Sequence, residues 1–250
     1  MDAGAKRAAI KKYFASFPKW AVWAIIIGLP LTAAWGIGLL LIIPGILVLV
    51  SFYKKPTDAE MDKFIAEDLS LAIKKSLKKA SIDESELVGE SVVVTGPRIW
   101  DTGGADCLSR EGKDGNLRFT PINISVLNMT ANQIIGYQSC LDLTTGNFLN
   151  ESTDEYFYTD VVSVSTKTDS RSINLKKHGK VETIQLDQAQ LFVLTTTGGT
   201  SFETILQDPK LIEMMGGGNI PTTHAEKAIQ VVRTMVRDKK QASMALRTAV

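Results

Sequence analysis

The octapeptide LTAAWGIG, residues 31–38, lies in the middle of the most apolar stretch of the chain. From Trp20 to Tyr53 the sequence contains no Asp, Glu, Lys or Arg. A single straight helix of that length would extend about 51 Å, whereas the hydrocarbon core of a bilayer is roughly 30 Å thick. The small residues of the octapeptide follow Pro30, and a tight turn among them predicts a transmembrane helical hairpin. Its two arms would be residues 20–34 and 36–53.

Basic residues flank the apolar run on both sides. Lys11, Lys12 and Lys19 precede it, and Lys54 and Lys55 follow it. Because cytoplasmic loops carry an excess of Lys and Arg, this pattern places both flanks on the cytoplasmic side. We therefore expect a protein of the inner (cytoplasmic) membrane, with residues 1–19 as a basic cytoplasmic N-terminus and residues 20–53 as the transmembrane hairpin.

One alternative to the hairpin is kept. A single span would export the C-terminal domain. The exported domain would then act in an envelope complex, and its Cys107 and Cys140 could pair. A signal peptide explains the run poorly, because its apolar core is only about 7–15 residues long and ends at a small-residue cleavage site. Here the run leads directly into Lys54 and Lys55.

Residues 54–90 are expected to contain an amphipathic linker helix. Thr57 and Glu60 have the spacing of a capping box and come directly after Pro56. The apolar residues that follow recur at helical spacing: Met61, Phe64, Ile65, Leu69, Ala72, Ile73 and Leu77. We predict that this apolar stripe packs on the following domain or on a second copy of the chain. Contact of the helix's C-terminal lysines with anionic lipid is the less favoured alternative.

Residues 91–245 have the pattern of a β-rich domain that ends in a helix. The predicted strands are 91–99, 117–130, 132–145, 155–168, 171–179, 182–187, 189–197 and 201–207, joined by Gly- and Asn-containing turns. Pro221 precedes an amphipathic helix over about 223–240, with Ile229, Val232 and Val236 on its apolar stripe. The fold class is therefore α+β.

Some seven antiparallel strands followed by one C-terminal helix are typical of a pleckstrin-homology-like (PH-like) barrel. Two segments also resemble bacterial PH-like families, over roughly residues 110–245. The matching residues are Tyr158, Asp160, Val161, Val162, Ser163 and Val164, and then Phe192, Leu194, Thr197, Gly198, Gly199 and Phe202. The resemblance implies an antiparallel PH-like β-barrel closed by a C-terminal α-helix, tethered to the membrane on its cytoplasmic side and used for interaction. An insert at 99–116 and a loop at 150–155 depart from the family pattern.

Charge and the metal-ligating residues exclude several classes of function. The chain has 28 Lys and Arg against 27 Asp and Glu, so its balanced charge does not indicate a nucleic-acid binder. Cys107 and Cys140 form no CxxC pair, and neither His178 nor His224 has a second ligand at metal-binding spacing. We expect no metal and no cofactor.

The segment IWDTGGADCL, residues 99–108, contains the Asp-Thr-Gly signature of aspartic proteases. QIIGY, residues 133–137, mimics their hydrophobic-hydrophobic-Gly partner, and in a homodimer two copies of Asp101 would share a proton. The short spacing between the two segments leaves little room for a flap. We therefore favour a glycine-rich surface loop and no enzymatic activity.

Taken together, these patterns predict a membrane-anchored, cytoplasm-facing adaptor or scaffold that binds a protein partner and forms a homo-oligomer. Anionic lipid is a second expected partner, since basic residues lie beside the membrane segment and in a predicted hairpin over 165–180. The possible headgroup contacts are Lys54, Lys55, Lys167, Arg171, Lys176 and Lys177.

Overall fold

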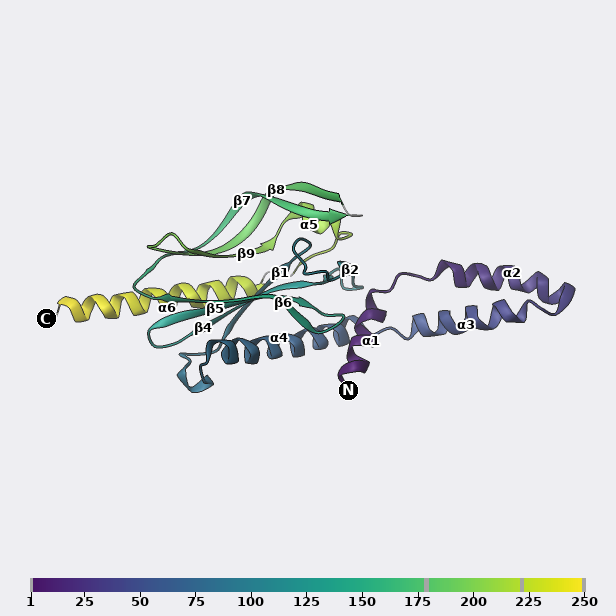
Figure 1. Cartoon of the computed structure of the whole chain (residues 1–250), viewed down its shortest axis with the longest axis horizontal. Helices are drawn as coiled ribbons and strands as arrows, with labels where there is room; N and C mark the ends of the chain where they lie inside the picture. Colours follow the sequence, from purple (N-terminus) through teal and green to yellow (C-terminus); the bar gives the residue numbers. More distant parts are fainter. Residues whose placement is uncertain (1, 178–179, 221–222, 249–250) are drawn as a thin grey trace. The chain divides into compact units, whose positions relative to one another are not determined.

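The computed structural model describes residues 2–177, 180–220 and 223–248. The chain is α+β and divides into two compact units, Met1–Phe64 and Ile65–Val250. Figure 1 labels most of the helices and strands of both units.

The first unit contains α1 (Ala3–Phe14), α2 (Lys19–Trp35), α3 (Leu39–Tyr53) and the start of α4. Figure 1 shows α2 and α3 antiparallel and side by side, joined by a short turn inside the octapeptide. Gly36 ends α2 in the left-handed region (φ 67°), where glycine pays no steric cost, and its N–H donates to Thr32 O at 3.1 Å. The predicted helical hairpin is therefore confirmed as a fold.

Glycine lets the two arms of the hairpin approach closely. A Cβ atom on Gly38 would lie 1.9 Å from Gly28 O, and one on Gly45 would lie 2.9 Å from Ala21 O. Such distances are shorter than van der Waals contact, so only glycine fits at these positions. The hairpin is packed backbone to backbone at two levels along its length.

Helix length does not decide whether the hairpin crosses a membrane. Among the described residues, no single helix is long and apolar enough to cross a bilayer. Two bent pairs are, by length and composition: Ala3–Phe14 with Lys19–Ala33, bent by 75°, and Leu39–Tyr53 with Asp58–Ala80, bent by 64°. Transmembrane insertion stays a prediction.

Helix α4 (Asp58–Ala80) begins at the predicted capping box. Thr57 N donates to Glu60 Oε2 at 2.8 Å, and Glu60 N donates to Thr57 Oγ1 at 3.2 Å. These bonds to Thr57 also hold the pKa of the exposed Glu60 below its usual value. The predicted linker helix is confirmed, and a short 3-10 turn (Glu84–Glu86) follows it.

The second half of α4 packs on the following domain, as predicted. Asn128 Nδ2 of β4 donates to the buried Ser76 Oγ at 2.9 Å, and Ser91 Oγ donates to Asn128 Oδ1 at 2.7 Å. On the same helix, Lys75 Nζ lies 2.9 Å from Glu151 Oε1 of β6. Burial alone raises the pKa of Glu151, but the hydrogen bonds from Lys75 and Tyr137 and the charge of Lys75 hold it below its usual value.

The second unit is built on three antiparallel sheets. The first has the order β1 (Val92–Pro97), β4 (Ile122–Met129), β5 (Gln133–Asp142) and β6 (Asn147–Phe157). The second pairs β2 (Leu108–Glu111) with β3 (Leu117–Thr120), and the third has the order β7 (Val161–Lys177), β8 (Lys180–Thr196) and β9 (Ser201–Gln207). Two helices follow, α5 (Pro209–Met214) and α6 (Thr223–Thr248).

The main core of this unit joins the four-stranded sheet, the three-stranded sheet and α6. Its buried side chains are Val92, Val94, Leu127, Met129, Ile134, Tyr156, Tyr158, Val161, Phe192, Leu194, Phe202, Leu206, Ile229, Val232 and Val236. Helix α6 contacts both β1 and β7. The prediction that Ile229, Val232 and Val236 are buried is confirmed.

The predicted closed barrel is wrong, because none of the described sheets closes on itself. Strands β1 and β9 approach each other without a hydrogen-bonded ladder. Polar side chains link the two larger sheets instead: Ser125 Oγ lies 2.5 Å from Thr204 Oγ1, and Gln138 Nε2 donates to Glu203 O at 2.9 Å. Helix α6 packs against β1 and β7.

Several predicted strand boundaries are also wrong. The strand expected over 117–130 is divided at Pro121, which cannot donate to a ladder. The expected loop at 150–155 is part of β6, and the expected insert at 99–116 contains β2. The three strands predicted over 171–197 belong to the long paired strands β7 and β8, and residues 178–179 between them lie outside the described residues. Helix α6 extends past 240 to Thr248, and α5 was not predicted.

Candidate functional site

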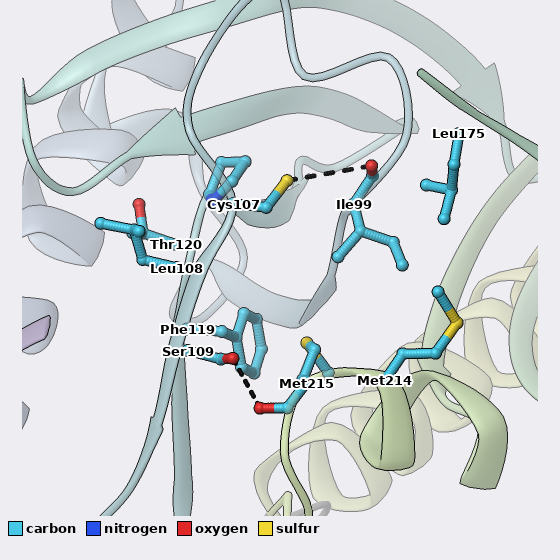
Figure 2. A pocket seen from close by; sticks show the side chains of 10 residues that line it. Ile99, Cys107, Leu108, Ser109, Phe119, Thr120, Leu175, Met214 and Met215 are labelled. Atoms are coloured by element: carbon cyan, nitrogen blue, oxygen red, sulfur yellow. Dashed lines mark hydrogen bonds between the residues drawn. The ribbon is translucent and has the colours of Figure 1, made fainter. Parts of the chain in front are cut away.

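One concavity of the second unit is an apolar pocket of about 250 Å³. It lies between the β2–β3 hairpin, the far end of β7 and the C-terminal end of α5. The lining residues are Ile99, Cys107, Leu108, Ser109, Phe119, Thr120, Pro121, Leu175, Met214 and Met215. Figure 2 shows Phe119 next to Met215, with Ile99 and Met214 close by.

Local sequence signals place α5 against this pocket. Asp208 caps the helix, its Oδ1 accepting from Lys210 N at 2.8 Å and from Leu211 N at 3.1 Å, and Pro209 occupies the first helical position. After α5, Gly216, Gly217 and Gly218 all have positive φ and reverse the chain.

The segment after α5 is then hydrogen-bonded to the β2–β3 hairpin. Leu117 N donates to Asn219 O at 2.7 Å, and Asn219 N donates to Gly115 O at 2.9 Å. Ser109 Oγ donates to Met215 O at 2.5 Å, which Figure 2 draws as a dashed line. The wall formed by Met214 and Met215 is thereby held opposite Phe119.

The polar side chains that line the pocket already have partners within the chain. Besides the Ser109 bond, Thr120 Oγ1 accepts from Leu143 N at 3.0 Å, and Cys107 Sγ lies 3.8 Å from Ile99 O. Although Cys107 is an exposed residue, partial desolvation of its thiol and the charge of Asp106 raise its pKa, which disfavours the nucleophilic thiolate. The pocket therefore suits an apolar group held by burial and offers no evident chemistry.

A second concavity, a groove of about 330 Å³, lies between the start of β7 and α6. Its lining residues are Val162, Ser163, Val164, Arg233, Val236, Arg237, Lys240 and Gln241. Arg233 Nε donates to Val164 O at 3.0 Å, so a side chain of α6 binds a backbone carbonyl of β7. Three basic side chains, those of Arg233, Arg237 and Lys240, therefore line the groove together with the apolar side chains of Val162, Val164 and Val236.

The predicted headgroup contacts do not form one free basic cluster in the described structure. Lys167 Nζ lies 3.2 Å from Asp169 Oδ2, and Arg171 NH2 lies 2.6 Å from Glu203 Oε2. In the first unit, Lys55 lies over the Phe52 ring at 3.7 Å and donates to Ala15 O. Lys54 is exposed, and the side chains of Lys176 and Lys177 lie outside the described residues.

The other residues singled out in the sequence stay apart. Asp101 is exposed in an irregular loop, and Asn150 Nδ2 donates to its backbone carbonyl at 2.6 Å. Over the residues that the structure describes, no group of three His, Cys, Asp or Glu side chains could hold a metal ion. Cys107 and Cys140 are free thiols, Cys107 exposed and Cys140 buried. His178 and the side chain of His224 lie outside the described part.

Comparison with known proteins identifies no relative: no protein-family model, curated protein or solved structure matches this chain.

We expect Asp101→Asn to leave the melting temperature nearly unchanged. Asp101 has φ 46°, a left-handed conformation that Asn also adopts readily, and surface-loop substitutions usually change stability by less than about 0.5 kcal/mol. Asp101→Ile is the matched contrast, because a β-branched residue is strained at this φ. Thermal melts of both variants check the loop, and a peptidase activity that Asp101→Asn abolishes would restore the protease hypothesis.

Proposed function

We propose that this chain is a membrane-anchored adaptor whose hairpin inserts into the cytoplasmic membrane and whose β-rich unit faces the cytoplasm, binds a protein partner and self-associates. The observation that carries the proposal is the exposed apolar surface of α2 and α3. Large hydrophobic side chains are exposed on both helices: Trp20, Trp23, Ile26, Ile27, Leu29, Leu31, Leu39, Leu40, Leu41, Ile43, Ile46, Leu47, Val50 and Tyr53.

A bilayer is the environment that removes such a surface from water. Each square ångström of apolar area withdrawn from water is worth about 25 cal/mol, and soluble proteins rarely expose patches larger than a few hundred square ångströms. Trp20, Trp23 and Tyr53 lie at the base of the hairpin, where aromatic side chains anchor membrane segments at the headgroup level. Lys54 and Lys55 follow directly and suit anionic headgroups.

The antiparallel pairing of α2 and α3 supports the proposal that both basic flanks of the hairpin lie on the same side of the membrane. With about 1.5 Å per residue, α2 extends about 26 Å and α3 about 23 Å, slightly less than the hydrocarbon core. Whether the turn reaches the far headgroups or stops short of them, the chain returns to the side from which it entered. The basic flanks make that side the cytoplasm.

The β-rich unit supports an interaction role. Two sheets packed around α6 agree with the PH-like resemblance, although the strands form no barrel. The apolar pocket beside α5 suits an apolar side chain of a partner protein, because its own polar atoms already have partners. Anionic lipid is the secondary partner that we propose, through Lys54 beside the hairpin; Lys167 and Arg171 would first have to exchange Asp169 and Glu203 for headgroups.

Reporter fusions at residues 15 and 250 test the anchor. Both should report the cytoplasm. Ile37→Cys, made in a Cys107→Ser background, should react with a membrane-impermeant thiol reagent only from the far side if the hairpin spans, and from neither side if the turn stays inside the bilayer.

A C-terminal reporter outside the cytoplasm, with the N-terminal one inside, would overturn the proposal. It would favour the exported single-span alternative. In that case non-reducing electrophoresis should show whether Cys107 and Cys140 pair.

A further inference from the structure

Several strands of the second unit have an edge without a ladder partner within the described residues, and β6 and β7 are two of them. Strand β6 pairs only with β5, and β7 pairs only with β8. An open edge is a ready template for association, which proteins usually blunt with charges or cover. The two edges are joined by a corner of only three residues, 158–160, so they lie near each other in each copy.

The β6 edge is acidic and uncovered. Residues 152–155 are all exposed, and Glu155 Oε2 accepts a hydrogen bond from Gln133 Nε2 of β5 at 3.1 Å. Asp154 and Glu155 supply two carboxylates, and Phe157 is 52% exposed. Because side chains alternate along a strand, Glu155 and Phe157 lie on the same face, a carboxylate beside an apolar ring.

The groove beside β7 has the complementary character. Arg233, Arg237 and Lys240 supply positive charge, while Val162, 59% exposed, lies on the apolar floor. The guanidinium of Arg233 uses Nε and NH2 toward β7 and keeps further N–H donors for a carboxylate. A groove of about 330 Å³ is roughly twice the size of an engineered cavity of about 150 Å³ that holds benzene, so it can take a phenyl ring.

We infer that two copies of this chain associate reciprocally, the acidic edge of β6 in each copy docking into the basic groove between β7 and α6 of the other. A two-fold interface uses the same patch on both subunits, and the short corner between β6 and β7 puts edge and groove into one such patch. The Phe157 ring would enter the groove over Val162, and Glu155, on the same face of β6, would lie beside Arg237 and Lys240, while Asp154 on the other face adds to the negative charge of the edge. This inference rests on the proposed self-association and names its surface.

Charge reversal on either side tests the interface in the full-length chain, held in lipid nanodiscs or detergent and measured by sedimentation or light scattering. Arg237→Glu with Lys240→Glu, and separately Asp154→Lys with Glu155→Lys, should each weaken self-association by at least about tenfold, because each sets like charges against one another. Lys74→Glu with Lys78→Glu, at two exposed positions on α4, is the matched control and should leave association unchanged.

Mixing the two reversal variants gives the sharper result. In a reciprocal dimer, the acidic edge of one variant meets the basic groove of the other, and the new basic edge meets the new acidic groove. The mixture should therefore regain the dimer that each variant alone has lost, which a folding defect would not allow. Reversal variants that keep the oligomer, or a mixture that stays monomeric, would overturn the inference alone, whereas a monomeric parent would overturn the proposed self-association as well.

Discussion

Val232→Asp is expected to unfold the β-rich unit. Val232 is 0% exposed and lies in the core between the two larger sheets, flanked on α6 by Ile229 and Val236. The substitution removes a buried apolar side chain and puts a carboxylate where the core offers only apolar neighbours. Burying an unpaired charge costs several kcal/mol, which is comparable to a whole domain's stability of about 5–15 kcal/mol.

Val231→Asp is the matched control, since it makes the same change one residue earlier on the same helix. Val231 is 47% exposed, so its carboxylate remains in water and the melting temperature should stay near that of the parent. Circular dichroism melts and limited proteolysis of the full chain measure both variants. If Val232→Asp melts like the parent, α6 is not packed on the sheets.

Arg233→Glu, which the helix pattern suggests as a neutral change at a solvent-facing position, is a poorer control. Arg233 is exposed, yet its Nε donates to Val164 O of β7. Helical periodicity predicts which side of a helix faces the core. It does not predict that a long side chain on the other side reaches back to a neighbouring strand.

Local signals predicted the parts of the chain whose structure depends on neighbouring residues. The small residues and glycines of the octapeptide predicted the turn, because Gly36 can adopt the left-handed conformation that ends α2. Thr57 and Glu60 predicted the start of α4, because a capping box depends only on residues three positions apart. Alternation predicted most of the strands, and the apolar stripe of α6 predicted its buried face.

Features that depend on distant segments were missed. The strand β6 reads as a loop, because its residues 150–155 are polar and lie at an exposed sheet edge. A closed barrel was expected from the number of strands. That number does not determine which strand edges pair, so the expectation was wrong. Helix α5 carried a readable signal, Asp208 before Pro209, but its six residues are too few for helical periodicity to show. The pocket beside α5 forms where three chain segments meet, and none of the three has a strong local sequence pattern.

Gly96→Ala is the second substitution with a large expected effect. Gly96 lies in β1 where this strand approaches β9, and a Cβ atom there would lie 1.9 Å from Ile205 O and 3.1 Å from Ile205 C. These are backbone atoms, so no side-chain rotation can relieve the overlap, and the two sheets would have to separate locally. Overpacking of this kind costs about 1–3 kcal/mol, and a rigid backbone obstacle favours the upper end.

A loss of that size should lower the melting temperature by roughly 2–12 °C in a unit of this length. Gly198→Ala is the matched control: its nearest neighbour to an added Cβ is Thr196 Oγ1 at 3.9 Å, an ordinary contact, so its melting temperature should remain near that of the parent. The comparison isolates the close approach of β1 and β9, since both variants add the same methyl group in place of a glycine hydrogen. Equal melting temperatures for the two would mean that β1 and β9 are not held together. In that case the Ser125–Thr204 contact would not be enough to link the two larger sheets. The core that both sheets share with α6 would then have to hold the two sheets together.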